Sequence, residues 1–206
     1  MRTLVIESAT EACSAALFEG GALLAGHSEV IGRGHAERLV PMIAQLPDKG
    51  RAERIAVSLG PGSFTGVRIG LAAARALGLA WNSEVVGYPT LALVAAMARA
   101  SNPEPVTVCM TGGHGEWFVQ DFGTGGLPEI SLASLRPEEA ARRTTRRLVA
   151  GSQAEALCAL LPSEHLAIQL LPDARQFQSL PEALLTADLS PLYGRPPDAR
   201  LPGPTP

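Results

Sequence analysis

One segment limits the possible folds more than any other, Gly60-Pro61-Gly62-Ser63-Phe64-Thr65-Gly66. It follows a short apolar stretch, Arg54 to Leu59, that predicts a β-strand, and it opens a helical stretch from Thr65 to Trp81. A strand, a glycine-rich turn and a helix in this order are typical of α/β proteins, where the turn can present backbone N–H groups to an anion. The same arrangement also serves as an ordinary connection, so both interpretations stay open.

Two familiar phosphate-binding motifs do not fit this segment. A Walker A loop has a lysine after its second glycine, but Thr65 and Val67 stand five residues after Gly60 and Gly62, with no lysine following either. A Rossmann loop needs its third glycine one residue earlier than Gly66. Any anion site here would therefore lack a lysine and would consist of the backbone N–H groups and the side-chain hydroxyl groups of the loop. The candidate phosphate-binding residues are Glu7, Gly60, Gly62, Ser63 and Thr65.

The helix after the loop carries a stripe of small residues. Gly66, Gly70, Ala74 and Gly78 fall four apart and so share one face. Each glycine inside a helix costs roughly 1 kcal/mol relative to alanine, so close packing must offset that cost. The partner of this face is either another part of the same domain or a helix of a second chain.

The chain opens with a β-rich region followed by a helix. Thr3 to Glu7, Cys13 to Phe18 and Ala22 to Val30 predict three antiparallel strands, with a tight hairpin turn at Gly20-Gly21. A helix is expected from His35 to Leu46. Its apolar stripe consists of Leu39, Met42, Ile43 and Leu46, and Pro41 should lie near its first turn or kink it.

The prolines of Ser101 to Pro105 mark the best boundary between domains. We expect an N-terminal lobe over residues 1–100, a smaller lobe over 101–194, and a disordered proline-rich tail over 195–206. Other elements expected are strands at Glu84–Gly87, Val106–Met110, Trp117–Phe122 and Arg147–Ala150, and helices at Thr90–Arg99, Pro137–Arg143, Ser152–Leu161 (capped by Ser152) and Pro181–Asp188.

Composition excludes several classes of protein. The chain is 46% hydrophobic and 18% charged, which suits a packed core and not a disordered chain. No apolar run reaches the roughly 18–20 residues of a membrane span, and Glu7 comes too soon for a signal peptide, so we expect a cytoplasmic protein with no membrane contact. The three cysteines are predicted to be core residues, and no histidine pair has the spacing of a metal site.

Charge gives little support for direct binding of nucleic acid. The net charge is −3. One basic cluster could contact phosphates, but Glu138 and Glu139 dilute it and no aromatic residues are interleaved, so a solvated face is expected. The cluster consists of Arg136, Arg142, Arg143, Arg146 and Arg147.

The run from Gly60 to Gly70 resembles the signature of the TsaB (YeaZ) family. Leu4 to Ser14 is similar to that family's opening strand and turn, and Gly34 to Ile43 to its first helix. Pro191 to Arg195 resembles its closing motif, and the likeness is strong over residues 1–100. The chain departs from the family where Glu7-Ser8 replaces Asp-Thr and where Gly112-Gly113-His114 replaces Asp-Ala-Arg, which puts in doubt any role of that second segment.

The resemblance implies an α/β protein with the actin/Hsp70-like (ribonuclease H-like) two-lobed fold, mixed sheets flanked by helices. It implies a subunit without chemistry, metal or cofactor of its own. Its partners would be a TsaD-type catalytic subunit that modifies adenosine 37 of tRNA and a TsaE-type ATPase that uses ATP in the wider complex. Because an uncovered apolar patch is a liability, we also expect the chain to pair with a second copy through the same surface when it is alone. The partner interface would consist of His35, Arg38, Leu39, Met42, Ile43, Leu46, Gly66, Gly70, Ala74 and Gly78.

Two other functions compete with this one. A free-standing nucleotide-dependent enzyme of the same fold, an ATPase or a kinase, would use Glu7 and the loop from Gly60 to Gly66. A metallopeptidase would require converging metal ligands. ATP turnover by the isolated chain would favour the first alternative, and bound metal the second.

Overall fold

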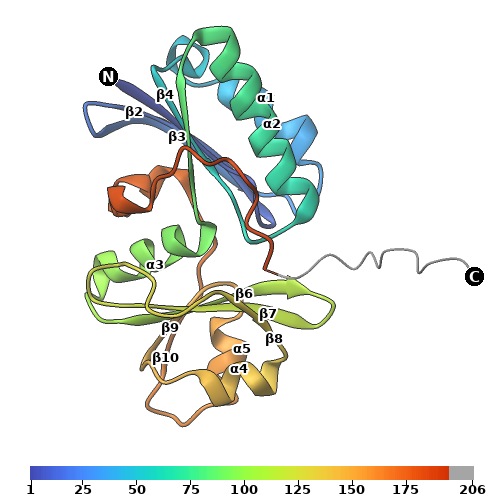
Figure 1. Ribbon diagram of the computed structural model, residues 1–206, viewed down its shortest axis with the longest axis vertical. Helices are drawn as coiled ribbons and strands as arrows, with labels where there is room; N and C mark the ends of the chain where they lie inside the picture. Colours follow the sequence, from blue (N-terminus) through green and yellow to red (C-terminus); the bar gives the residue numbers. More distant parts are fainter. Residues whose placement is uncertain (195–206) are drawn as a thin grey trace, which may run out of the picture.

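A computed structural model describes residues 1–194, which form two five-stranded sheets built to the same plan (Figure 1). The strand order is β3-β2-β1-β4-β5 in the first sheet and β10-β9-β6-β7-β8 in the second. In each, three consecutive strands run antiparallel and two later strands add in parallel to the first of them. This repetition confirms the expected actin/Hsp70-like α/β fold with mixed sheets.

The first sheet begins with the predicted antiparallel strands. Strand β1 (Arg2–Glu7) pairs with β2 (Ala12–Glu19), and β2 pairs with β3 (Ala22–Val30). Gly20 and Gly21 have φ values of 56° and 90°, a left-handed conformation that glycine adopts without strain, and this confirms the tight hairpin turn. Strands β4 (Arg54–Ser58) and β5 (Glu84–Tyr88) extend the sheet in parallel, as buried apolar strands do.

The second sheet is smaller. Its strands are β6 (Val106–Gly113), β7 (Glu116–Phe122), β8 (Ala133–Leu135), β9 (Leu148–Ala150) and β10 (Leu166–Ile168). The sequence analysis missed β8 and β10, whose residues are mostly half-buried, whereas it predicted the equally short β9, whose three apolar residues are buried.

The helices form layers on and between the sheets (Figure 1). Helices α1 (His35–Ala44) and α2 (Phe64–Trp81) cover one face of the first sheet, and α3 (Thr90–Ser101) lies between the two sheets. Helices α4 (Pro137–Arg143) and α5 (Ala154–Cys158) cover the far face of the second sheet. The central core therefore joins both sheets through α3, whose buried residues include Leu91, Leu93 and Val94.

The chain returns to the first sheet after β10. Two short 3-10 helices, η2 (Ala174–Ser179) and η3 (Glu182–Leu184), lie beside it, as a third, η1 (Pro47–Gly50), does near α1. The backbones of Gly87 and Thr186 exchange two hydrogen bonds, of 2.7 Å and 3.0 Å. The division into lobes at residues 1–100 and 101–194 stays a prediction, and the tail over 195–206 lies outside the described residues.

Three local predictions were wrong or imprecise. Pro41 lies inside α1 and not in its first turn, on the exposed side of the helix. Ser152 does not cap α5, because its hydroxyl accepts a hydrogen bond from the Thr111 amide and Gln153 takes the cap position. The expected helix at Pro181–Asp188 is only the single turn η3. Within residues 1–194, none of the helices is both long and apolar enough to cross a membrane.

Candidate functional site in the cleft between the lobes

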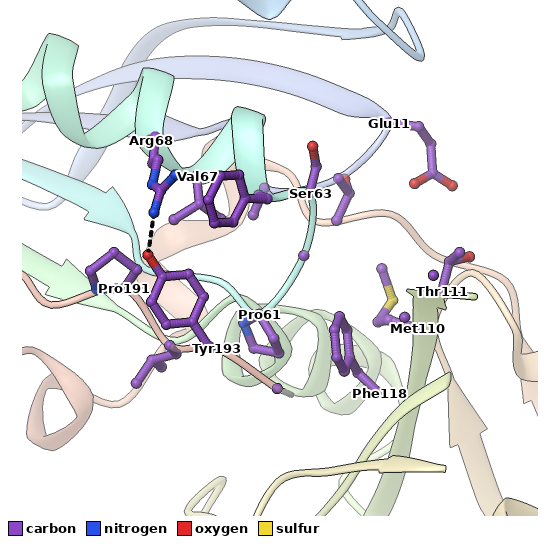
Figure 2. Close-up of a pocket in the computed structure, with 18 of the residues that line it drawn as sticks. Glu11, Pro61, Ser63, Val67, Arg68, Met110, Thr111, Phe118, Pro191 and Tyr193 are labelled. Atoms are coloured by element: carbon purple, nitrogen blue, oxygen red, sulfur yellow. Dashed lines mark hydrogen bonds between the residues drawn. The ribbon is translucent and has the colours of Figure 1, made fainter. Parts of the chain in front are cut away.

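A cavity of about 740 Å³ opens where the two sheets approach each other (Figure 2). The side of the first sheet contributes the turn between β1 and β2, through Ala9, Thr10 and Glu11, and the glycine-rich loop that begins α2. The side of the second sheet contributes the hairpin between β6 and β7, and the closing segment from Pro191 to Gly194 forms a further wall. Four segments distant in sequence therefore meet at this cleft.

The glycine-rich loop packs tightly against the turn that follows β1. A Cβ atom on Gly62 would lie 1.9 Å from the Ala9 carbonyl oxygen, and one on Gly66 would lie 2.1 Å from the Ser8 carbonyl oxygen. The Ser63 amide donates a 2.6 Å hydrogen bond to the Ala9 carbonyl, and the Ser63 hydroxyl caps α2 by accepting from the Gly66 amide at 3.2 Å. These glycines therefore permit close backbone contact between two loops of one lobe.

The structure separates the five predicted phosphate-binding residues. Gly62 and Ser63 line the cleft, whereas Gly60 is buried and Thr65 points to solvent outside the lining. Glu7 is fully buried beneath the turn and does not line the cleft. The five residues thus do not converge on one ligand position.

Glu7 stabilises the turn that follows β1 from the buried side of that turn. Its Oε1 accepts a 2.8 Å hydrogen bond from the Ala9 amide, and the Tyr88 hydroxyl, which donates to the Ile6 carbonyl at 3.1 Å, lies 3.4 Å from its Oε2. Burial raises the pKa of the Glu7 carboxyl to about 7, and the hydrogen bonds from Ala9, Ser58 and Tyr88 oppose that rise only in part. The structure therefore favours a structural role for Glu7, as a turn residue bonded to a backbone N–H group.

The stripe of small residues on α2 faces the first sheet of its own chain. A Cβ atom on Gly70 would lie 2.4 Å from the Ser8 hydroxyl, and one on Gly78 would lie 2.4 Å from a Val85 methyl group. Gly66, Gly70, Ala74 and Gly78 are all buried. Of the two partners that the sequence left open, the structure selects packing within the domain.

The structure buries most of the residues predicted for the partner interface within the chain itself. Nine of the ten are buried inside the chain, because the apolar stripe of α1 packs on the same core as the small stripe of α2. His35 is among them, with its Nε2 atom 2.8 Å from the Thr10 carbonyl oxygen. Arg38 is exposed and forms an ion pair with Glu29. The nine buried residues are His35, Leu39, Met42, Ile43, Leu46, Gly66, Gly70, Ala74 and Gly78.

The opposite faces of the same two helices are exposed and mostly apolar. The exposed fraction is 59% for Val40 on α1 and 88% for Leu79 on α2, which is unusual for large apolar side chains. The signal was available in the sequence, since the residues that do not belong to the buried stripes are themselves largely apolar. The smaller exposed residues between them are Ala36, Pro41, Ala44, Ala72, Ala76 and Ala80.

An aromatic and cationic cluster lies at the mouth of the cleft, and the sequence analysis did not find it. The Arg68 guanidinium lies over the Phe64 ring, 3.4 Å from its centroid, and donates a 3.0 Å hydrogen bond to the Tyr193 hydroxyl (Figure 2). The Leu192 amide donates to the Leu59 carbonyl at 2.8 Å, which fixes the closing segment against the first lobe. Only a motif far away in sequence completes this cluster, so helical periodicity could not reveal it.

Other candidate groups have ordinary surroundings. The basic cluster is partly neutralised, since Arg146 pairs with Glu129 and Arg147 lies 3.6 Å from Glu104. Within residues 1–194, no group of three or more His, Cys, Asp or Glu side chains could hold a metal ion. Cys13 and Cys109 are buried free thiols, as predicted, and Cys158 is half-buried.

Known proteins resemble this chain over both lobes. The family described as TsaD, tRNA N6-adenosine threonylcarbamoyltransferase, matches residues 27–127. The tRNA threonylcarbamoyladenosine biosynthesis protein TsaB of Escherichia coli is 41% identical over 148 residues, which are 67% of this chain and 64% of that protein. The protein of the same name from Haemophilus influenzae is 38% identical over 104 residues, 48% of this chain and 42% of that protein.

Solved structures extend the likeness to nearly the whole fold. YeaZ from Pseudomonas aeruginosa superposes with a TM-score of 0.78 at 29% identity, covering 93% of this chain and 99% of that one. The chain belongs to the TsaB (YeaZ) family. The matched region spans 64% of the E. coli TsaB protein, less than two thirds of its length.

Proposed function

We propose that this chain is a non-catalytic scaffold subunit of the complex that forms N6-threonylcarbamoyladenosine at position 37 of tRNA. It binds a TsaD-type catalytic subunit through the outward faces of α1 and α2. The exposed apolar side chains of Val40 and Leu79 carry this proposal, together with the alanines between them. Exposed apolar surface of this kind is a frequent mark of a protein–protein interface.

The proposed interface differs from the one predicted from sequence in its residues, but it lies on the same part of the fold. The same two helices are used, but the contacts lie on the sides that face away from the first sheet. The small side chains on α1 and α2 allow the backbone of a partner helix to approach closely. Alone, the chain covers the same surface by pairing with a second copy.

The remaining partners follow from membership of the family. A TsaE-type ATPase joins the complex, ATP is used by the other subunits, and tRNA is reached through the complex in the cytoplasm. The position of Glu7 supports a role without chemistry. A general base must reach its substrate, whereas this carboxylate is buried and hydrogen-bonded to the turn below the cleft. The rival function, a free-standing ATPase or kinase, relied on Glu7.

The test is size-exclusion chromatography with light scattering, on this chain alone and mixed with the TsaD-type subunit of the same organism. We expect a homodimer that converts to a mixed complex. The variant Leu79→Glu should weaken that complex at least about tenfold, because a buried unpaired carboxylate is costly at an interface. The matched control is Leu160→Glu, since Leu160 is also exposed (51%) but lies in the second lobe after α5.

Two outcomes would contradict the proposal. One is that the chain is monomeric and does not bind the TsaD-type subunit. The other is equal weakening by Leu79→Glu and Leu160→Glu, which would place the contact elsewhere. ATP turnover by the isolated chain that Glu7→Gln abolishes would instead establish the rival function.

A further inference from the structure

The cleft between the lobes has the size and lining of a small-molecule site. Its volume of about 740 Å³ lies within the range of roughly 300–1,000 Å³ that is common for such sites. Phe64, Phe118 and Tyr193 place aromatic rings around it, and Met110 and Val67 add aliphatic surface. A flat apolar molecule would bury most of its area against these side chains.

The charged groups of the cleft are few and lie apart. Arg68 and Glu11 are the charged side chains among its lining residues, and they lie on opposite sides of it (Figure 2). Over residues 1–194, neither Arg68 nor Glu11 forms a salt bridge. One end of the cleft therefore attracts an anion, and the other end repels it.

The Arg68 guanidinium is held in position before any ligand arrives. The Phe64 ring supports one face of it, and the Tyr193 hydroxyl accepts from one of its nitrogen atoms. A guanidinium has five N–H donors, so the others stay available to an anionic group. The ordering of this side chain lowers the entropy that binding would otherwise cost.

From this arrangement we infer that the cleft binds a planar apolar molecule that carries one anionic group, with the anion at Arg68 and the ring system against Phe118 and Met110. The charge pattern selects against a polyphosphate, because a single cation faces several negative charges and Glu11 adds repulsion. This binding site goes beyond the proposed scaffold role, and its test needs no partner subunit.

The experiment titrates the full chain with three probes and follows protein chemical shifts by NMR. The probes are naphthalene-1-sulfonate, the uncharged naphthalene-1-methanol, and ATP with Mg²⁺. For a ligand of this size we expect saturable binding of the sulfonate with a Kd of about 1 mM or lower. It should bind about three- to tenfold more tightly than the alcohol, owing to charge-assisted hydrogen bonds at a partly exposed arginine.

Two variants and one control locate the anion. Arg68→Gln should remove the preference for the sulfonate, whereas Arg75→Gln, on the same helix but outside the cavity lining, should leave it unchanged. Glu11→Gln should tighten sulfonate binding about twofold, because it removes a repulsive charge. Thermal unfolding of each variant checks that the fold is retained.

The inference is overturned if the sulfonate shows no saturable binding, or if Arg68→Gln and Arg75→Gln have equal effects. Tighter binding of ATP with Mg²⁺ than of the sulfonate would also overturn it, since the cleft would then prefer a ligand with several negative charges. None of these results affects the mixed complex with a TsaD-type subunit, so failure of this inference and failure of the scaffold role are separable.

Discussion

The two faces of helix α2 have opposite relations to the rest of the molecule. The inner face consists of Gly66, Gly70, Ala74 and Gly78, and it lies so close to the first sheet that a single Cβ atom would collide with Ser8 or Val85. The outer face exposes Leu79, Ala72 and Ala76 to solvent. The inner face makes contacts within the chain, whereas Leu79, Ala72 and Ala76 leave exposed apolar surface on the outer face.

This difference shows why a stripe of small residues is ambiguous in a sequence. Small residues allow close approach to any surface, whether it belongs to the same domain or to another chain. Large exposed apolar residues are more informative about a partner, because a large apolar side chain has a lower free energy when it is buried than when it is exposed to solvent. Substitutions on each face in turn test this difference.

The largest effect is expected from Gly70→Leu on the inner face. A leucine side chain would overlap the Ser8 hydroxyl, which itself donates to the Gly66 carbonyl at 3.0 Å, so the helix must separate from the sheet. We expect a loss of more than about 4 kcal/mol in the free energy of unfolding, or no cooperative folding at all.

The matched control is Ala72→Leu, two residues further along on the exposed side of the same helix. Alanine and leucine have similar helix propensities, so its unfolding free energy should change by less than about 0.5 kcal/mol. Urea denaturation followed by circular dichroism measures both variants. Equal stability of the two would show that the inner face is not packed as described.

A smaller effect concerns Glu7, which lies beneath the turn against which the inner face packs. Its pKa is 4.5 when unperturbed and about 7 in the folded protein, where burial raises it. Well below pH 4.5 the carboxyl is protonated in both the folded and the unfolded state, so its ionisation does not affect the free energy of unfolding. As the pH rises from 4.5 to 7, the unfolded state ionises first, so stability falls and the full loss is reached above pH 7.

The variant Glu7→Gln isolates this dependence, because a glutamine stays neutral and can still accept the bond from the Ala9 amide. We expect the variant to equal the wild type near pH 4 and to exceed it above pH 7 by roughly 3 kcal/mol. Denaturation curves from pH 4 to pH 8 measure the difference. A constant difference across this range would mean that the folded protein does not hold Glu7 with a raised pKa.

Sequence patterns predicted the fold well where local chemistry decides it. The pair Gly20-Gly21 fixed the first hairpin, and the apolar strand before Gly60 fixed the position of β4 and α2. The two-lobed arrangement of mixed sheets was implied by the family resemblance and not by periodicity. Strands β8 and β10, with three residues each, depend on their neighbours in the sheet and left no pattern to read.

The cleft was harder to predict because it is formed by side chains from distant segments. The loop from Gly60 to Gly66 was recognised, but its glycines serve contact with Ala9 and Ser8, and the sequence gives no measure of such distances. Likewise, Arg68 and Tyr193 are 125 residues apart, and their contact depends on the chain returning to the first lobe after β10. Tertiary structure, and not local propensity, decides both features.

The smallest effect is expected from Tyr193→Phe, at the point where the closing segment reaches the outer side of α2. The substitution removes the hydrogen bond from Arg68 but keeps an aromatic ring 6.1 Å from Phe64. Because both partners are exposed, unfolding should become easier by only about 0.5 kcal/mol. Urea denaturation beside the wild type measures it. A loss above about 2 kcal/mol would mean that the outer side of α2 is held to the chain as firmly as the inner face, and the contrast between the two faces would then be wrong at this end of the helix.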